Sequence, residues 1–323
     1  HFYINLVGTN SMISMRLIIL FCVVLMLAAC QKETNQGLST PFIGGLSGFS
    51  VGFQADAPPK EVYDGGRFPF AVVVKIQNIG EFLVPKDKVK VSLSGIDPVE
   101  FGLNPNDLIK SPGDDMLPRR KDAGGNILES NPFFLEFKNL NHVRRITGSA
   151  LDFPLRAEVC YNYGTIATSK LCSRKNVLNP TPGGICTINE EKKVANSGAP
   201  VQIVSLQEST RAQDKVAFTF KIQHVGTGFL YRKLTGCEKS SIRATEQKVF
   251  VNVREPASGV ECVGLSSNSV PNQGEVTLFD GSNTVTCTMT LQRPGDFEFP
   301  VTIDLNYDYE DTTETNLLVK RSE

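Results

Sequence analysis

Two stretches of the chain, "FPLRAEVCYNYGTIATSKLC" (153–172) and "FPVTIDLNYDYEDTTETNLL" (299–318), follow nearly the same pattern at an offset of 146 residues. Both begin with Phe-Pro, and both carry Tyr-x-Tyr eight residues later. Up to the tyrosines every second residue is apolar, which is the period of a strand with one face in a core and the other in water. We therefore expect each stretch to form the last hairpin of a β-sheet domain, with the tyrosines on its core face.

The repeat extends beyond these two stretches. "FAVVVKIQNIGEFL" (70–83) matches "VAFTFKIQHVGTGFL" (216–230), and "VEFGL" (99–103) matches "VECVGL" (260–265) after an insertion in the second copy. The chain is therefore a tandem duplication. Several short strands per copy, separated by Gly, Pro, Asn and Asp, favour a two-sheet sandwich over a single curled sheet.

We expect an all-β protein with two tandem immunoglobulin-like antiparallel β-sandwich domains after an N-terminal signal and lipid anchor. The first domain is expected at 46–178 and the second at 199–323. Residues 179–198 are rich in Pro, Gly and Asn, which is typical of a linker.

The start of each copy resembles a known module. "APPKEVYDGGRFPFAVVVKIQNIGE" (57–81) has an initial strand, a turn and a strand ending in Asn-x-Gly, and residues 199–228 follow the same plan with His224 in place of Asn. This plan resembles the beginning of CARDB-type and related immunoglobulin-like modules of archaeal and bacterial surface proteins. The resemblance implies an immunoglobulin-like sandwich with a binding or spacer role, and it brings no catalytic residues.

The N-terminus carries an export pattern. After Met15-Arg16 comes "LIILFCVVLMLAA" (17–29), an apolar run of thirteen residues. A membrane span needs about 20 residues, so this run fits the apolar region of a secretory signal. We interpret residues 1–29 as a signal peptide with upstream residues, and we expect translation to start at Met12 or Met15.

The run ends in "LAAC" (27–30), which resembles the lipobox of prokaryotic surface lipoproteins. The resemblance implies a lipid on Cys30, a polar tether at 30–45 and an extracytoplasmic position at the membrane surface. An ordinary signal or uncleaved anchor with a chance cysteine is the alternative.

Six cysteines remain beyond Cys22 in the signal and Cys30. An even number in an exported chain predicts disulfides, with buried free thiols as the alternative. No C-x-x-C pair is present, which disfavours a zinc site. The six are Cys160, Cys172, Cys186, Cys237, Cys262 and Cys287.

Comparison of the copies suggests three pairs. A symmetric closing hairpin in the first copy would place Cys160 opposite Cys172. The second copy lacks both cysteines, which supports their pairing. Cys262 and Cys287 would cross the second core, since Cys262 takes the place of Phe101. Cys186 and Cys237 would then fasten the linker to the second domain.

Few residues suggest catalysis. His142 and His224 are the candidate bases, and the sequence contains no G-x-S-x-G or H-E-x-x-H motif. The acidic stretch 304–314 could bind calcium, but a solvated hairpin is the simpler interpretation. Tyr161, Tyr163, Tyr307 and Tyr309 could form a sugar-stacking platform, although their core register favours packing.

These observations favour a non-catalytic, membrane-anchored binding, adhesion or scaffold lipoprotein without a cofactor. Its partners would be the membrane, through Cys30, and a protein or surface polymer. The chain has 323 residues with a formal net charge of −1, which argues against a nucleic-acid partner. A structural subunit of an envelope filament or of a secretion or transport assembly is the alternative, and a hydrolase is the third.

Overall fold

Alternation between apolar and polar residues produces strands throughout the described part of the chain. The computed structural model describes residues 40–178, 183–239, 243–254, 259–266, 270–291 and 295–323. In β3 (Phe70–Asn78), Val72, Val74 and Ile76 are buried, whereas the intervening Lys75 is exposed. This period of two places one face of the strand in the core. The expectation of an all-β fold built from antiparallel sheets is confirmed.

The other strands vary greatly in length. They are β1 (Phe49–Phe53), β2 (Glu61–Tyr63), β4 (Val89–Ser94), β5 (Ile109–Lys110), β6 (Arg120–Lys121), β7 (Ile127–Leu128), β8 (Phe133–Leu140), β9 (Ala150–Ser173), β10 (Ala195–Asn196), β11 (Val201–Ala212), β12 (Lys215–His224), β13 (Phe229–Tyr231), β14 (Lys248–Arg254), β15 (Val260–Val263), β16 (Gln273–Thr277), β17 (Ser282–Thr290) and β18 (Phe297–Lys320). Two short 3₁₀ helices, η1 (Lys86–Lys88) and η2 (Pro105–Leu108), lie between strands.

Most strands belong to three sheets. One outer sheet has the order β1-β3-β8, and the other has the order β11-β12-β17-β15. The central sheet follows the order β16-β14-β18-β9-β4-β5, and β2, β10 and β13 pair with its two longest strands. A separate ribbon consists of β6 and β7. Buried side chains from the two outer sheets and the central sheet belong to one continuous hydrophobic core.

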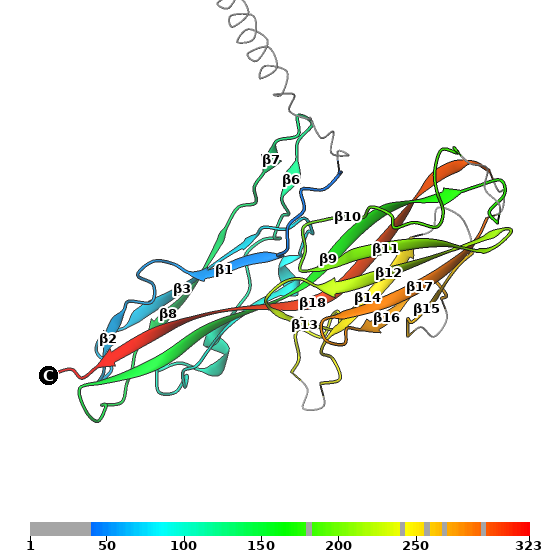
Figure 1. Cartoon of the computed structure of the whole chain (residues 1–323). Helices are drawn as coiled ribbons and strands as arrows, with labels where there is room; N and C mark the ends of the chain where they lie inside the picture. Colours follow the sequence, from blue (N-terminus) through cyan, green and yellow to red (C-terminus); the bar gives the residue numbers. More distant parts are fainter. Residues whose placement is uncertain (1–39, 179–182, 240–242, 255–258, 267–269, 292–294) are drawn as a thin grey trace, which may run out of the picture. The chain divides into compact units, whose positions relative to one another are not determined.

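The two longest strands, β9 and β18, join the copies. Each has 24 residues, and they pair antiparallel from Phe297 opposite Ser173 to Lys320 opposite Ala150. They run side by side through the whole sheet (Figure 1). β4 pairs with the first half of β9, and β14 pairs with the first half of β18. Each copy therefore contributes the beginning of its last strand to its own sandwich and the end of that strand to the other.

We define two lobes on this basis. The first lobe contains β1 to β8, residues 150–161 of β9 and residues 310–320 of β18. The second lobe contains β10 to β17, residues 163–173 of β9 and residues 297–308 of β18.

The pairing gives the duplication a two-fold axis. Residues 151–173 of β9 correspond to the residues 146 positions later in β18, and Asn162 lies opposite its own counterpart, Asp308. Tyr161 lies opposite Tyr309, which corresponds to Tyr163. This arrangement is isologous, like the interface of a two-fold symmetric dimer, but here it forms within one chain.

The expected closing hairpins are wrong. The apolar alternation in β9 continues past the tyrosines through the buried Ala167 and Leu171, so the chain does not turn back near Gly164. Its antiparallel partner is β18, not a returning arm of the same copy. Gly164 instead allows a close approach, because a Cβ atom there would meet the Phe82 ring at 2.5 Å.

Residues Pro41–Glu323 form one compact unit. The expected ranges 46–178 and 199–323 therefore describe the two copies in the sequence, while the fold connects them through exchanged strand ends.

The six cysteines form three disulfides. The expected Cys262–Cys287 bridge is present between β15 and β17. The other two expected pairs are wrong, because Cys160 pairs with Cys237 and Cys172 pairs with Cys186. Without a hairpin, Cys160 and Cys172 lie far apart along one extended strand, and each bonds to a different loop.

The N-terminal expectations are not covered by these observations. Residues 1–39, with the signal pattern, the lipobox and Cys30, lie outside the described residues, as do residues 179–182 of the expected linker. Within the described ranges, no helix is long and apolar enough to span a membrane.

Candidate functional site: a tyrosine cluster and an open sheet edge

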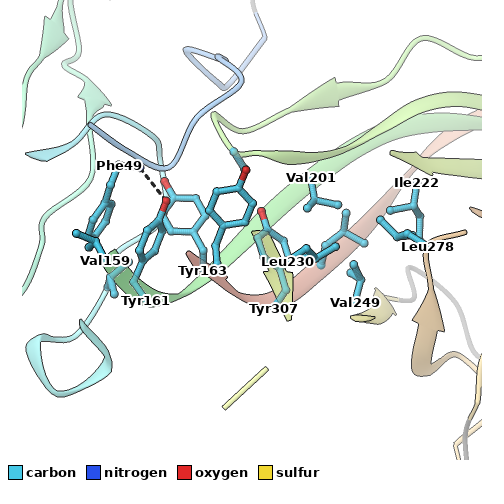
Figure 2. Close-up of a cluster of buried hydrophobic side chains, with 14 of the residues drawn as sticks. Phe49, Val159, Tyr161, Tyr163, Val201, Ile222, Leu230, Val249, Leu278 and Tyr307 are labelled. Carbon is cyan, nitrogen blue, oxygen red and sulfur yellow. Dashed lines mark hydrogen bonds between the residues drawn. The ribbon is translucent and has the colours of Figure 1, made fainter. Parts of the chain in front are cut away.

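Four tyrosines lie where the two lobes meet. Tyr161, Tyr163, Tyr307 and Tyr309, which we call the tyrosine cluster, are at most 1% exposed. They occupy one face of the β9–β18 pair, around the two-fold axis. Figure 2 shows three of them in a row of buried side chains that contains Phe49 of the first lobe and Val201 of the second. The expectation that these tyrosines pack in the core is confirmed.

The hydroxyl contacts of the cluster follow the two-fold repeat. Tyr161 donates a hydrogen bond to Asp311 Oδ2 at 2.6 Å, and Tyr307 Oη lies 3.1 Å from Thr165 Oγ1. Asp311 is the counterpart of Thr165, at the offset of 146 residues. The two contacts are therefore the same contact in the two copies, with a carboxylate in one and a hydroxyl in the other.

The other two hydroxyls contact the ends of β3 and β12. Tyr163 donates to Asn78 Oδ1 at 3.2 Å, and Tyr309 Oη lies 2.9 Å from His224 Nε2. His224 is the counterpart of Asn78, so it fills a structural position at a strand end. Burial lowers the pKa of His224, which favours the neutral ring in this contact.

Asp308 lies at the two-fold axis and holds a loop of the second lobe. It accepts hydrogen bonds from the amides of Leu234 at 2.9 Å and of Thr235 and Gly236 at 2.7 Å. Asn162 donates to the same carboxylate at 2.9 Å. The loop continues to Cys237, whose bridge to Cys160 fixes it over the central sheet.

The acidic stretch 304–314 is the middle of β18 and not a hairpin. Its carboxylates contact separate partners: Asp304 pairs with Arg254 at 2.7 Å, and Glu310 pairs with Lys239 at 3.0 Å. No group of three or more His, Cys, Asp or Glu side chains in the described residues is arranged to hold a metal ion.

His142 lies in the first lobe, apart from the tyrosine cluster. Its side chain is fully buried, and Nε2 lies 3.2 Å from Glu100 Oε1. The ring packs edge-on against Phe101, with centroids 5.2 Å apart. The structure thus brings His142 beside a carboxylate and His224 beside a phenol, in two different lobes.

The buried Glu208 and the half-buried Asp311 have raised pKa values. Burial raises the pKa of Asp311 to about 6, against the effect of the Tyr161 hydrogen bond. Burial likewise raises the pKa of Glu208 to about 7, although the Cys172 amide donates to both carboxylate oxygens at 3.0 Å and Lys192 Nζ lies 3.2 Å away.

The first lobe has an open edge beside β8. A pocket of about 280 Å³ lies between residues 110–113, at the end of β5, and residues 133–136 of β8. Phe134 is 54% exposed at this edge. We call this feature the β8 groove. Sequence reasoning missed it, because both copies were expected to form equivalent sandwiches. The available signal was that the residues after "VEFGL" in the first copy differ from the residues after "VECVGL" in the second copy.

No protein-family model and no curated protein matches the sequence. Among solved structures, the secreted serine protease VesC from Vibrio cholerae is 9% identical with a TM-score of 0.17, over 80% of this chain and 50% of that one. Red sea bream transglutaminase is 11% identical with a TM-score of 0.17, over 86% of this chain and 32% of that one. The chain spans half or less of the length of these proteins. At these scores the likeness carries no argument about fold or activity.

Proposed function

We propose that this protein is a non-catalytic binding or scaffold module, held at the outer surface of a cell membrane by a lipid on Cys30. The observation that carries the proposal is the reciprocal exchange of the ends of β9 and β18. The exchange fixes two sandwiches to each other through a shared sheet and a shared core. A rigid body of this kind can hold loops and sheet edges at a constant separation, which suits presentation to a partner.

The polar groups in the interior support the same conclusion. The tyrosine hydroxyls and His224 connect the shared sheet to the strands beside it. Three disulfides fasten loops and strands to this frame, as is typical of proteins outside the cytoplasm. In this proposal the interior provides rigidity and the surface provides recognition.

The anchor is tested by replacing Cys30 with Ser in the full chain and measuring the fraction that sediments with membranes. We expect Cys30→Ser to release the protein, while Cys22→Ser, in the same N-terminal run, leaves it bound. Equal membrane association of the two variants would refute lipid anchoring.

The binding role is tested by placing a photo-cross-linking residue at exposed positions of either lobe, such as Phe134 and Val204. We expect a discrete cross-linked product from at least one position in cells that make the anchored chain. The absence of a product at every exposed position would refute a partner-binding role.

A further inference from the structure

The two lobes differ at one edge of their outer sheets. The sheet β1-β3-β8 corresponds to β11-β12-β17. Val72 on β3 corresponds to Phe218 on β12 at the offset of 146 residues. Val72 lies opposite Phe137 of β8 and Phe218 lies opposite Cys287 of β17, so β8 corresponds to β17. The second lobe adds a fourth strand, β15, beside β17. In the first lobe, β8 pairs with β3 and with no other strand among the described residues.

In the second lobe, β15 and the residues after it close the side of the sandwich. β15 pairs antiparallel with β17, and the Cys262–Cys287 bridge fastens the pair. Ser266 and Glu275 then exchange backbone hydrogen bonds at 2.7 and 3.1 Å, which connects this segment to β16 in the central sheet. One extended segment therefore links both sheets.

The first lobe lacks this segment. Phe101 takes the place of Cys262 in the repeat, but it lies in a turn with its ring buried in the core. β5 pairs with β4 as β16 pairs with β14, so Ser111 corresponds to Glu275. Ser111 lines the β8 groove. The groove thus occupies the position that residues 262–266 fill in the second lobe.

The groove is suited to an extended chain and not to a large ligand. Its volume of about 280 Å³ lies just below the range of ligand pockets, which is roughly 300–1,000 Å³. Its lining alternates between Leu135, which is buried, and Phe134 and Glu136, which are exposed. An added strand would direct every second side chain into the pocket.

The open part of the edge is short. Asn139 has a positive φ of 62°, and the Asn141 amide donates to the Phe101 carbonyl at 3.0 Å, so the Phe101 turn covers the end of β8. Residues 133–138 remain available. Within them, a two-fold pairing of two copies centred on Glu136 would place like charges directly opposite each other, which is destabilising. The pairing centred on Leu135 would place Glu136 opposite the apolar Phe134, and the pairing centred on Phe137, with Glu136 opposite Lys138, would use only residues 136–138 of each copy. A second copy of this chain therefore fits the edge poorly.

We propose that the β8 groove binds an extended segment of another protein, which adds to the sheet antiparallel to β8 in the position that β15 and the following residues fill in the second lobe. The segment carries apolar side chains, as residues 262–266 of the second lobe do with Cys262 and Leu265, which pack against the core. This inference rests on the proposed binding function and names its partner class. Backbone hydrogen bonds to the edge supply affinity, and the pocket supplies selectivity.

The test uses the full chain and a labelled synthetic peptide of residues 259–266 with Cys262→Val. We expect saturable binding by fluorescence anisotropy and slower amide exchange of residues 133–138. Gly113→Phe should weaken binding at least about tenfold, because a Cβ atom at Gly113 meets no heavy atom within 4 Å and a side chain there would enter the groove. Gly52→Phe is the matched control on β1, at the opposite edge of the same sheet, where a Cβ atom also has open space.

Three results would overturn the inference: no saturable binding up to about 1 mM peptide, equal binding by Gly113→Phe and the parent chain, or protection confined to residues outside 110–113 and 133–138. If the peptide fails while a cross-linking residue at position 204 still captures a partner, the inference fails and the proposed function stands. If no position captures a partner, the proposed function fails as well.

Discussion

At the scale of single residues, the tyrosine cluster shows how one contact differs between the copies. Tyr161 contacts a carboxylate, Asp311, whereas Tyr307 contacts a hydroxyl, Thr165. A half-buried carboxylate that loses its donor keeps much of its desolvation cost, while Thr165 retains the Val201 carbonyl as an acceptor. The two tyrosines are therefore equivalent by position and different in energy.

We predict that Tyr161→Phe destabilises the protein by about 2–3 kcal/mol and Tyr307→Phe by about 1 kcal/mol. The free energy of unfolding in urea at neutral pH measures both. The two substitutions remove the same hydroxyl from symmetric positions, but Tyr161→Phe also takes away the acceptor of the Phe49 amide, which donates to the Tyr161 hydroxyl at 3.1 Å, and this lost bond adds to its larger cost. Equal losses would show that the carboxylate does not depend on its donor.

The raised pKa of Glu208 predicts how the folding stability of the protein depends on pH. Its pKa is raised to about 7 by burial, so the folded protein binds this proton more tightly than the unfolded chain. Its contribution to stability is present below its ordinary pKa and is lost as the pH rises through about 7. Asp311 changes in the same direction, with a pKa of about 6.

We predict that melting temperature falls less between about pH 5 and pH 8 in Glu208→Gln than in the parent chain. Glu190→Gln is the matched control, because Glu190 also contacts Lys192, at 2.7 Å, but lies near the surface. Parallel pH profiles for Glu208→Gln and the parent chain would contradict the assignment to Glu208.

At the scale of elements, the apolar alternation predicted the strands and the core face of the tyrosines, but not where the last strands end. Gly164 suggested a turn, whereas it serves the approach of the Phe82 ring in mid-strand. A period of two shows that residues are extended and which face they bury. It does not show which partner strand completes the sheet, because that choice depends on residues far away in the sequence.

The same limit explains the disulfides. Cys262–Cys287 was predictable because both sequence positions have counterparts in the first copy, even though the strand β15 that carries Cys262 does not. Cys160–Cys237 and Cys172–Cys186 depend on loops that the other copy does not share. The β8 groove escaped prediction for a related reason, since it results from a strand that one copy has and the other lacks.

We predict that peptide mapping of the non-reduced protein recovers the three bridges of the structure. The Cys160–Cys237 bridge closes a separation of 77 residues and Cys172–Cys186 one of 14, so their removal should cost about 4 and about 3 kcal/mol. Double Cys→Ala variants and urea unfolding measure both costs. Recovery of a Cys160–Cys172 peptide would contradict the continuous strand.

At the scale of the whole molecule, the duplication behaves as a two-fold dimer within one chain. The ends of β9 and β18 are exchanged about the Asn162–Asp308 pair, much as elements are exchanged in domain swapping. The first lobe therefore depends on the last residues of the chain: Leu317 and Val319 of β18 have no exposed surface, and β2 pairs with residues 318–320. Neither copy contains a complete sandwich of its own.

We predict that fragments 41–198 and 199–323 do not fold alone and do fold when refolded together under oxidising conditions. Each fragment lacks the strand end that covers its core, and an uncovered core of this size exceeds the few kcal/mol by which domains are stable. Dispersed amide signals in the NMR spectrum report folding, and a non-reducing gel shows whether Cys160 and Cys237 have linked the two fragments. A fragment 41–198 that gave a dispersed spectrum by itself would show that the first sandwich is independent and that the exchange only joins two finished domains. Linked fragments with the spectrum of the intact chain would show instead that the exchanged strands are what makes either sandwich stable.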